Sequence, residues 1–171
     1  VEVMLNNGDG TFAAAQTYGI EGGQSNAVAT ADVNGDGKVD LISAVRITST
    51  LSVLLNIGDG TFAAAQTYAA TGPDPDPQAI AMGDINGDGK VDIVTADGAS
   101  NTVSVLLNNG DGTFAAGESF AVTGFYPDAV ALGDVNGDGK QDIVSANCNS
   151  ANYSVLLNDG NGGFLAAQAT D

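Results

Sequence analysis

The stretch "DVNGDGKVD", Asp32–Asp40, decides how the rest of the chain is interpreted. It returns as "DINGDGKVD" at Asp84–Asp92 and as "DVNGDGKQD" at Asp134–Asp142. Each copy alternates Asp or Asn with small residues and lies between two apolar runs. One copy alone would suit an acidic hairpin turn, in which Asn-Gly and Asp-Gly pairs bend the chain and the acids face water. Three copies that keep every oxygen-bearing position favour a metal site instead.

The alternating positions of each copy supply hard oxygen ligands. Helix–loop–helix calcium sites use the same arrangement, with alternate oxygens around a Gly that allows a sharp bend. The chain has no His and one Cys, so it lacks the nitrogen and sulfur ligands that zinc and copper sites use. Magnesium prefers to keep several waters, so a loop with many protein oxygens favours calcium. We therefore predict three Ca²⁺ sites, in which each Lys contributes its backbone carbonyl: Asp32, Asn34, Asp36, Lys38, Asp40; Asp84, Asn86, Asp88, Lys90, Asp92; and Asp134, Asn136, Asp138, Lys140, Asp142.

The helix–loop–helix hand itself is excluded by two features. Its twelfth position needs a bidentate acid, but the chain has Ser43, Thr95 and Ser145 there, and the flanking segments have the pattern of strands. The acid at position nine would have to close the cage instead. Each site would gather three carboxylates that repel one another, so calcium is expected to stabilise the fold.

A second repeated element follows each acidic loop. The run "SVLLN" occurs three times with a variant "EVMLN" near the start, and each is followed by a Gly-rich turn and a Phe. These turns have too few alternating oxygens for a metal site, and the last one replaces Asp with Asn161. We interpret them as β-turns whose aromatic residues return to the core: Phe12, Phe62, Phe114 and Phe164.

One repeat of 50 to 52 residues contains four short strand patterns, at Ala27–Asp32, Asp40–Val45, Leu51–Asn56 and Phe62–Tyr68 in the first full copy. Four strands in this length is the signature of a β-propeller blade. The predicted fold is all-β, a β-propeller of four-stranded antiparallel blades with about three and a half blades in this chain. Rings close with roughly four to eight blades, so we expect a partial propeller or a ring completed by another chain. The expected units are a half blade at 1–18 and blades at 26–68, 78–120 and 128–168.

The motif "DxNGDGKxD" between strands, repeated about every 50 residues, resembles the FG-GAP/VCBS-type repeats of integrin-α-like β-propellers. The resemblance implies calcium in the loop between strands one and two, at the fifteen residues given above. It also implies an extracellular or cell-surface protein that serves adhesion, binds a ligand or carbohydrate, or accompanies a secreted enzyme. The chain departs from the pattern in having "FAA" where the family name expects Phe-Gly, and in having about half the usual blades.

Composition narrows the partners. The formal net charge is −17 with four basic residues, which argues against nucleic acid and against an anionic membrane surface. Hydrophobic residues make up 43% of the chain, enough for a packed core, and no apolar run approaches the roughly 20 residues of a membrane span. The chain begins with Val1, so we interpret it as a mature, trimmed or excised piece. Cys148 has no partner for a disulfide, and we expect a small, partly buried loop residue there.

Binding specificity is expected in the connections that differ between repeats. In an up-and-down meander the acidic loops and Gly-rich turns share one face, and the dissimilar connections lie on the other. Variable loops on a rigid scaffold commonly carry recognition. The candidate ligand residues on that face are Arg46, Phe125, Tyr126 and Tyr153. Alternatively, Phe125 and Tyr126 pack between blades, and Arg46 only offsets local acidity.

Three functions remain open from the sequence. The first is a calcium-stabilised extracellular binding or adhesion module for a protein or carbohydrate ligand. The second is a structural unit that self-assembles into a ring or filament, with homo-oligomers completing the propeller. The third is an enzyme, such as a polysaccharide-degrading one, or the accessory propeller of such a secreted enzyme. Catalysis by this chain is disfavoured because it has no His and no evident nucleophile–base pair. Asp74 and Asp76 could mimic a catalytic dyad, but the alternating Pro residues favour a stiff exposed loop. We expect no enzyme activity.

Overall fold

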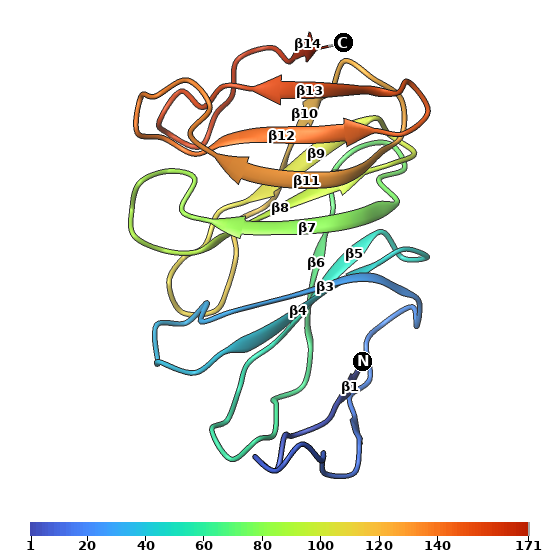
Figure 1. The fold of residues 1–171 in the computed structure, drawn as a ribbon, viewed down its shortest axis with the longest axis vertical. Coiled ribbons are helices and arrows are strands. Elements are labelled where there is room, and N and C mark those ends of the chain that lie inside the picture. Colours follow the sequence, from blue (N-terminus) through green and yellow to red (C-terminus); the bar gives the residue numbers. More distant parts are fainter. Residues whose placement is uncertain (171) are drawn as a thin grey trace.

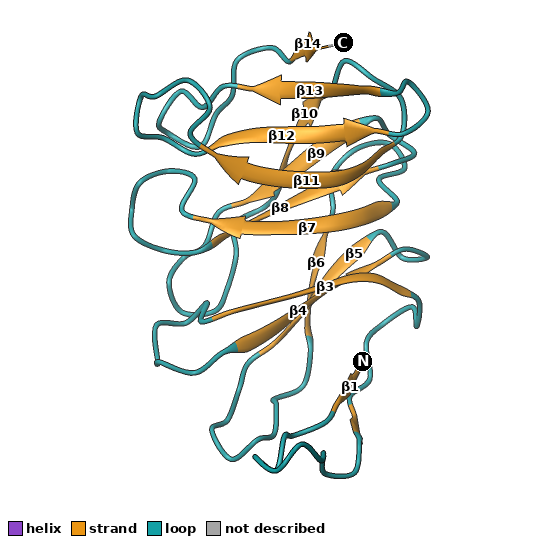
Figure 2. Ribbon diagram, viewed as in Figure 1, coloured by secondary structure: helices purple, strands orange, loops and turns teal. Residues whose placement is uncertain are grey.

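The structure, a computed structural model, describes residues 1–170, and every regular element in that range is a β-strand (Figures 1 and 2). No helix in this part of the chain has the length and apolar character needed to cross a membrane. The strands are β1 Glu2–Val3, β2 Gln16–Thr17, β3 Ser25–Ala31, β4 Asp40–Val45, β5 Thr50–Leu54, β6 Gln66–Ala69, β7 Pro77–Gly83, β8 Asp92–Asp97, β9 Thr102–Leu106, β10 Glu118–Ala121, β11 Pro127–Gly133, β12 Asp142–Asn147, β13 Asn152–Leu156 and β14 Gln168–Thr170.

The strands form three sheets of four and one of two, all with antiparallel neighbours in chain order. We call β3–β6 the first blade, β7–β10 the second, β11–β14 the third, and β1–β2 the half blade. The first strands of successive full blades lie next to one another, β3 beside β7 and β7 beside β11. The predicted arrangement of four-stranded antiparallel blades with a half blade is confirmed.

Strand boundaries differ from the predicted ones where a segment has no neighbouring strand to pair with. The strand β4 has the predicted bounds, but β6 begins four residues after Phe62, which makes only an isolated bridge to Asn56. In the half blade the apolar run at residues 2–6 is a strand only at Glu2–Val3. A two-stranded hairpin has little stability alone, so this run stays mostly irregular without strands one and two beside it.

Two hydrophobic clusters hold the blades together. One lies between the first and second blades and includes Ile42, Leu51 and Leu106, and the other lies between the second and third and includes Val94 and Leu156. An edge-to-face aromatic pair crosses each junction, namely Tyr18–Phe62, Tyr68–Phe114 and Phe120–Phe164, with ring centroids 5.2 to 5.4 Å apart.

The expectation that all four turn Phe residues return to the core is wrong for Phe12. Its side chain is 58% exposed, whereas Phe114 at the same repeat position is 7% exposed. Phe114 is covered by Tyr68 of the preceding blade. Among the described residues no blade precedes the half blade, so Phe12 has no equivalent of Tyr68 packed on it.

The connections fall on two opposite sides of the blades. In the second and third blades the acidic loops lie at the left of Figure 1, and the β8–β9 and β12–β13 connections lie at the right. The near-identical loops and the dissimilar loops are therefore separated by the length of the strands. We call the second side the variable face.

Candidate calcium loops and ligand recess

The acidic loop of the first blade is shaped by its own carboxylates. Asp32 accepts backbone hydrogen bonds from Gly35, Asp36 and Gly37 at 2.8, 3.2 and 2.7 Å. Asn34 Oδ1 accepts one from Asp36 at 3.0 Å. The bend uses Gly35 and Gly37 at φ of 73° and 81°, a left-handed conformation that glycine adopts without strain. The loop therefore holds its first three acceptor side chains around one turn.

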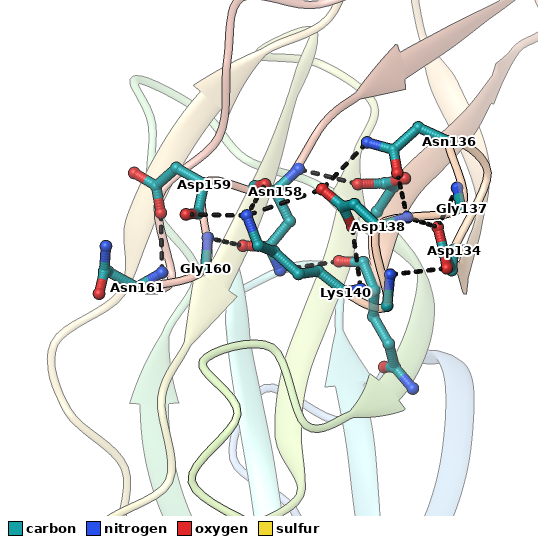
Figure 3. A network of polar contacts seen from close by, with 12 residues as sticks. Asp134, Asn136, Gly137, Asp138, Lys140, Asn158, Asp159, Gly160 and Asn161 are labelled. Atoms are coloured by element: carbon teal, nitrogen blue, oxygen red, sulfur yellow. Dashed lines mark hydrogen bonds and ion pairs between the residues drawn. The ribbon is translucent and has the colours of Figure 1, made fainter.

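The other two loops repeat this pattern. Asp84 and Asp134 make the same three backbone contacts, and Figure 3 shows the third loop with Asp134, Asn136 and Asp138 gathered around its turn. The Lys at position seven donates its backbone N–H to the Asp at position five in every loop. Its ammonium also lies 2.8 to 3.6 Å from that Asp. In the first loop, these contacts with Lys38 lower the pKa of Asp36.

The acid at position nine has a separate role that the sequence did not reveal. Asp92 is fully buried, and its carboxylate accepts the backbone N–H of Ile85 at 2.9 Å and of Asn108 at 2.7 Å. Asp40 and Asp142 make the equivalent pairs of bonds. Burial raises the pKa of Asp92, and the two backbone donors oppose that rise. Each of these residues ties the start of its acidic loop to the end of the blade's third strand.

The donor set of the loops fits calcium, but the acids do not form a closed cage in the structure. In residues 1–170, no group of three or more acidic or Cys side chains is placed to hold a metal ion. The position-nine carboxylates point at backbone donors. An ionised carboxylate has about four acceptor sites, so one bond per oxygen leaves capacity for a cation. The donors are hard oxygens only, as calcium prefers. The fifteen ligand assignments stay predictions.

On the variable face, two of the four candidate ligand residues, Arg46 and Tyr126, both bond to Asp76. Asp76 accepts a 2.7 Å hydrogen bond from Arg46 Nε and a 3.2 Å bond from the Tyr126 hydroxyl. Asp76 is 8% exposed and has a φ of 50°, whereas Asp74 is exposed. The expectation of a stiff exposed loop is therefore wrong for Asp76, because an ion pair draws its carboxylate into the surface.

These residues line a recess of about 540 Å³, to which connections of all three full blades contribute. All of its lining comes from the variable face: Gln24, Arg46, Ile47, Ser49, Asp74, Asp76, Ala99 and Tyr126. The volume lies within the range of small-molecule sites, roughly 300 to 1,000 Å³. A second recess of about 290 Å³ adjoins the Gly-rich turn at 159–163, and it therefore belongs partly to the repeated turns.

The other two candidates lie apart from this recess. Phe125 is 65% exposed and does not line it, so the alternative of packing between blades is wrong for Phe125. Tyr153 lines a separate recess of about 330 Å³ that also contains Cys148. Cys148 is exposed, contrary to the expected partial burial, because the β12–β13 turn carries it out to the surface.

A buried carboxylic acid lies beneath the variable face at the end of β8. Asp97 is fully buried and accepts hydrogen bonds from the hydroxyls of Thr95 and Ser104. Burial raises the pKa of Asp97 to about 7, and the two hydroxyl contacts oppose the rise. The third blade has Asn147 at this position, where Asn147 Oδ1 accepts from the Ser145 hydroxyl and Asn147 Nδ2 donates to the Ser154 hydroxyl.

Replacing Asp97 with Asn is expected to stabilise the protein above neutral pH. A raised pKa in the fold means that stability falls as pH rises from about 4 to about 7, because the unfolded chain releases this proton first. The variant lacks that penalty, so it should be more stable by roughly 2–4 kcal/mol at pH 8 and nearly unchanged at pH 4. Chemical denaturation at the two pH values measures the difference. Equal effects at both would contradict a titrating Asp97.

Comparisons with known proteins agree with this architecture. A model of the FG-GAP-like repeat matches residues 1–43, 32–95 and 84–145. An Agrocybe aegerita lectin, whose solved structure concerns recognition of non-reducing terminal N-acetylglucosamine, matches at 29% identity with a TM-score of 0.60. The Pseudomonas aeruginosa periplasmic gluconolactonase PpgL matches at 18% identity with a TM-score of 0.62. A search of curated proteins gave no match.

The chain spans less than half the length of either solved structure. The match with the lectin covers 98% of this chain and 45% of the lectin, and the match with the gluconolactonase covers 87% and 40%. At 18% identity the second likeness concerns the fold alone. Together with the family match, these likenesses confirm the predicted blade-based β-propeller.

Proposed function

Because the chain belongs to the family of FG-GAP-like repeats, we propose that it is a calcium-stabilised propeller module that binds carbohydrate on its variable face. Its role is binding rather than catalysis. A calcium dependence of this kind suits the extracellular space or the cell surface, where calcium modules work with affinities of about 10⁻⁴ to 10⁻³ M.

The observation that carries the proposal is the recess built around Asp76. There the Arg46 guanidinium and the Tyr126 phenol each donate a hydrogen bond to the Asp76 carboxylate. Sugar hydroxyls both donate and accept hydrogen bonds, so a mixed set of donors and acceptors on a concave surface suits them. The ring of Tyr126 adds an apolar surface beside these polar groups. The likeness to a lectin at 29% identity supports the same ligand class.

The variable face can hold specificity because the opposite side is fixed. In each acidic loop calcium would be held by the Asp and Asn side-chain oxygens and by the backbone carbonyl of Lys. Its positive charge would reduce the repulsion between the carboxylates. Within the loops the chain's own hydrogen bonds already define the turn. The carboxylates of Asp40, Asp92 and Asp142 connect each acidic loop to the third strand of its blade by hydrogen bonds. These bonds fix the strands that carry the variable loops relative to one another.

Replacing Asp76 with Asn is expected to weaken saccharide binding by about tenfold or more. A hydrogen bond to a charged group contributes about 1.5–3 kcal/mol, and Asn keeps the shape while losing the charge. Asn also tolerates the positive φ of this position. A glycan array, followed by titration of the glycans that bind, measures the change.

The matched control is Asp111→Asn. It makes the same change of charge in an exposed Gly-rich turn, where the last repeat already has Asn161. It should leave binding unchanged. Equal binding by wild type and the Asp76 variant would contradict the recess as the site, and a wild type that binds no glycan would contradict the proposed ligand class and leave a protein ligand.

A further inference from the structure

Asn followed directly by Gly occurs six times in the chain, and such a pair can react with itself in water. The Asn residues of these pairs are Asn7, Asn34, Asn86, Asn109, Asn136 and Asn161. The backbone nitrogen of the Gly can attack the side-chain amide carbon of the Asn, because Gly has no Cβ atom to block the approach. A hydrogen bond on either the attacking N–H or the attacked amide must break before the two groups can meet.

In five of the six pairs the N–H of the Gly is held by an acceptor. Gly8 and Gly110 each donate to the side-chain oxygen of an Asn at 2.7 Å. In the acidic loops the acceptor is an Asp carboxylate at 2.6 to 2.8 Å, and the pairs are Gly35–Asp32, Gly87–Asp84 and Gly137–Asp134. Bonds to a charged acceptor are the stronger ones, so these three nitrogens are held most firmly.

The amide side chains of the same five pairs are held as well. Asn7 and Asn109 each donate from Nδ2 to a Thr hydroxyl at 2.9 Å. In each acidic loop the Asn Oδ1 accepts the backbone N–H of the residue two positions later, at 2.8 to 3.1 Å. Each of these five pairs must therefore break two hydrogen bonds before it can react.

Asn161 is the exception. It is exposed, and the N–H of Gly162 has no acceptor among residues 1–170. The Asn161 amide makes no hydrogen bond to the described residues either, and Figure 3 shows it directed away from the neighbouring acidic loop. The backbone N–H of Asn161 is bonded, to Asp159 Oδ1 at 2.8 Å. Both groups that must meet are thus unrestrained.

Two sequence differences in the last Gly-rich turn account for this. In the other turns an Asp occupies the position of Asn161 and is held by the Thr two residues later. Asp111 Oδ1, for example, accepts the N–H and the hydroxyl of Thr113 at 3.0 and 2.6 Å. The last turn has Gly163 in place of this Thr, so it has no hydroxyl, and the Gly163 N–H is donated to Asp159 at 3.2 Å instead.

We propose that Asn161 is a site of spontaneous deamidation. The nitrogen of Gly162 forms a bond to Cγ of Asn161, and the bond from Cγ to the amide nitrogen breaks. That nitrogen takes up the proton of the Gly162 N–H and leaves as ammonia, and a five-membered succinimide ring remains. Water then opens the ring at either carbonyl, which gives aspartate or isoaspartate at position 161. The reaction proceeds whether or not the variable face binds carbohydrate.

The modification would change the contact between the second and third blades. Either product adds a negative charge beside Asp159 and Glu118, which line the recess of about 290 Å³ together with Asn161. Isoaspartate also lengthens the backbone of the turn by one methylene group. In this turn Gly162 packs closely on Leu107, because a Cβ atom on the Gly would lie 3.1 Å from a Leu methyl carbon. The longer backbone is therefore expected to loosen this contact.

Incubation of the intact folded protein at physiological pH and temperature, followed by peptide mapping with mass spectrometry, tests the proposal. The mass gained when an amide becomes an acid is measured at each of the six Asn residues over several weeks. Asn161 is expected to convert at least about tenfold faster than any other, because each other pair must first break two hydrogen bonds.

The same incubation in urea is the first control. Every one of the six Asn residues is followed by Gly, so in the unfolded chain their rates should become similar. The difference between the two incubations separates the effect of the fold from that of the local sequence.

The second control is Gly163→Thr, which returns the hydroxyl that the other turns have. Thr stands at this position in the other three turns, and the nearest atoms to a Cβ on Gly163 belong to the side chain of Asp159, which can move. The variant should deamidate severalfold more slowly at Asn161 when folded and at the wild-type rate in urea. Circular dichroism checks that it folds.

A comparison of products tests the expected loosening between the blades. Anion exchange separates the isoaspartate form from the unmodified protein, and Asn161→Asp carries the same charge on a backbone of normal length. The isoaspartate form should melt at a lower temperature than this variant, and equal melting temperatures would refute the loosening.

Three outcomes would overturn the site itself. The first is a folded protein in which another Asn converts as fast as Asn161. The second is a preference for Asn161 that persists in urea, because local sequence rather than the fold would then cause it. The third is a folded Gly163→Thr variant that reacts at the wild-type rate, because the missing hydroxyl would then not explain the reactivity.

Discussion

Adding calcium to the metal-free protein is expected to raise its melting temperature by about 10 °C or more. A ligand at a hundredfold excess over its dissociation constant stabilises a fold by about 2.7 kcal/mol per site, and there are three loops. In a domain of this size 1 kcal/mol shifts the melting temperature by roughly 2–4 °C. Nine Asp residues are gathered in these loops, and their repulsion falls when each loop takes a divalent ion. Calorimetry with calcium and with chelator measures the shift.

The matched control exchanges the same number of charges in the two kinds of repeated loop. The triple variant Asp36→Asn, Asp88→Asn and Asp138→Asn should lose most of the calcium response. The triple variant Asp9→Asn, Asp59→Asn and Asp111→Asn should keep it, because these residues lie in the Gly-rich turns that we interpret as plain β-turns. An equal response from both variants would mean that calcium acts through overall charge rather than through the acidic loops.

Replacing Asp92 with Ala is expected to destabilise even the metal-free protein by about 3–5 kcal/mol. The change leaves the N–H groups of Ile85 and Asn108 buried without acceptors, and each such loss costs about 1–3 kcal/mol. Asp92→Asn should cost less, since its one oxygen keeps one of the two bonds. Urea denaturation in the presence of chelator measures both variants.

The chelator separates the two roles of Asp92. If the carboxylate served only as a calcium ligand, the Ala variant would be as stable as the wild type without calcium, and the tie between loop and strand would be refuted. A loss in chelator that grows further with calcium would agree with both roles.

Much of the fold could be predicted because the same sequence pattern occurs in each repeat. Each repeat of 50 to 52 residues shows the same strand patterns and turn glycines. These patterns together predicted the blades and the half blade that the structure contains. Strand ends were less predictable, because pairing depends on neighbours that the sequence does not show. The short β1 and the exposed Phe12 both follow from the lack of an adjoining blade in this chain.

The site was predictable only in part. Alternating oxygens identified the acidic loops, but the burial of Asp92 depends on a strand that begins ten residues later. Arg46 and Tyr126, two of the predicted ligand residues, both bond to Asp76 on the variable face, and their role in binding stays a prediction. Asp76 was not selected as a binding residue, because its burial arises from an ion pair across thirty residues of chain. The packing of a Leu of one blade against a turn Gly of the next could not be predicted, because the turn alone accounts for the Gly.

The most direct test of carbohydrate binding on the variable face is a nuclear magnetic resonance titration of the ¹⁵N-labelled protein with the saccharide that gives the strongest signal on the glycan array. The account predicts saturable shifts at the amides around Gln24, Arg46, Ser49, Asp76 and Tyr126, with the acidic loops and Gly-rich turns unchanged. Shifts confined to the repeated loops, or no shifts at millimolar sugar, would contradict it.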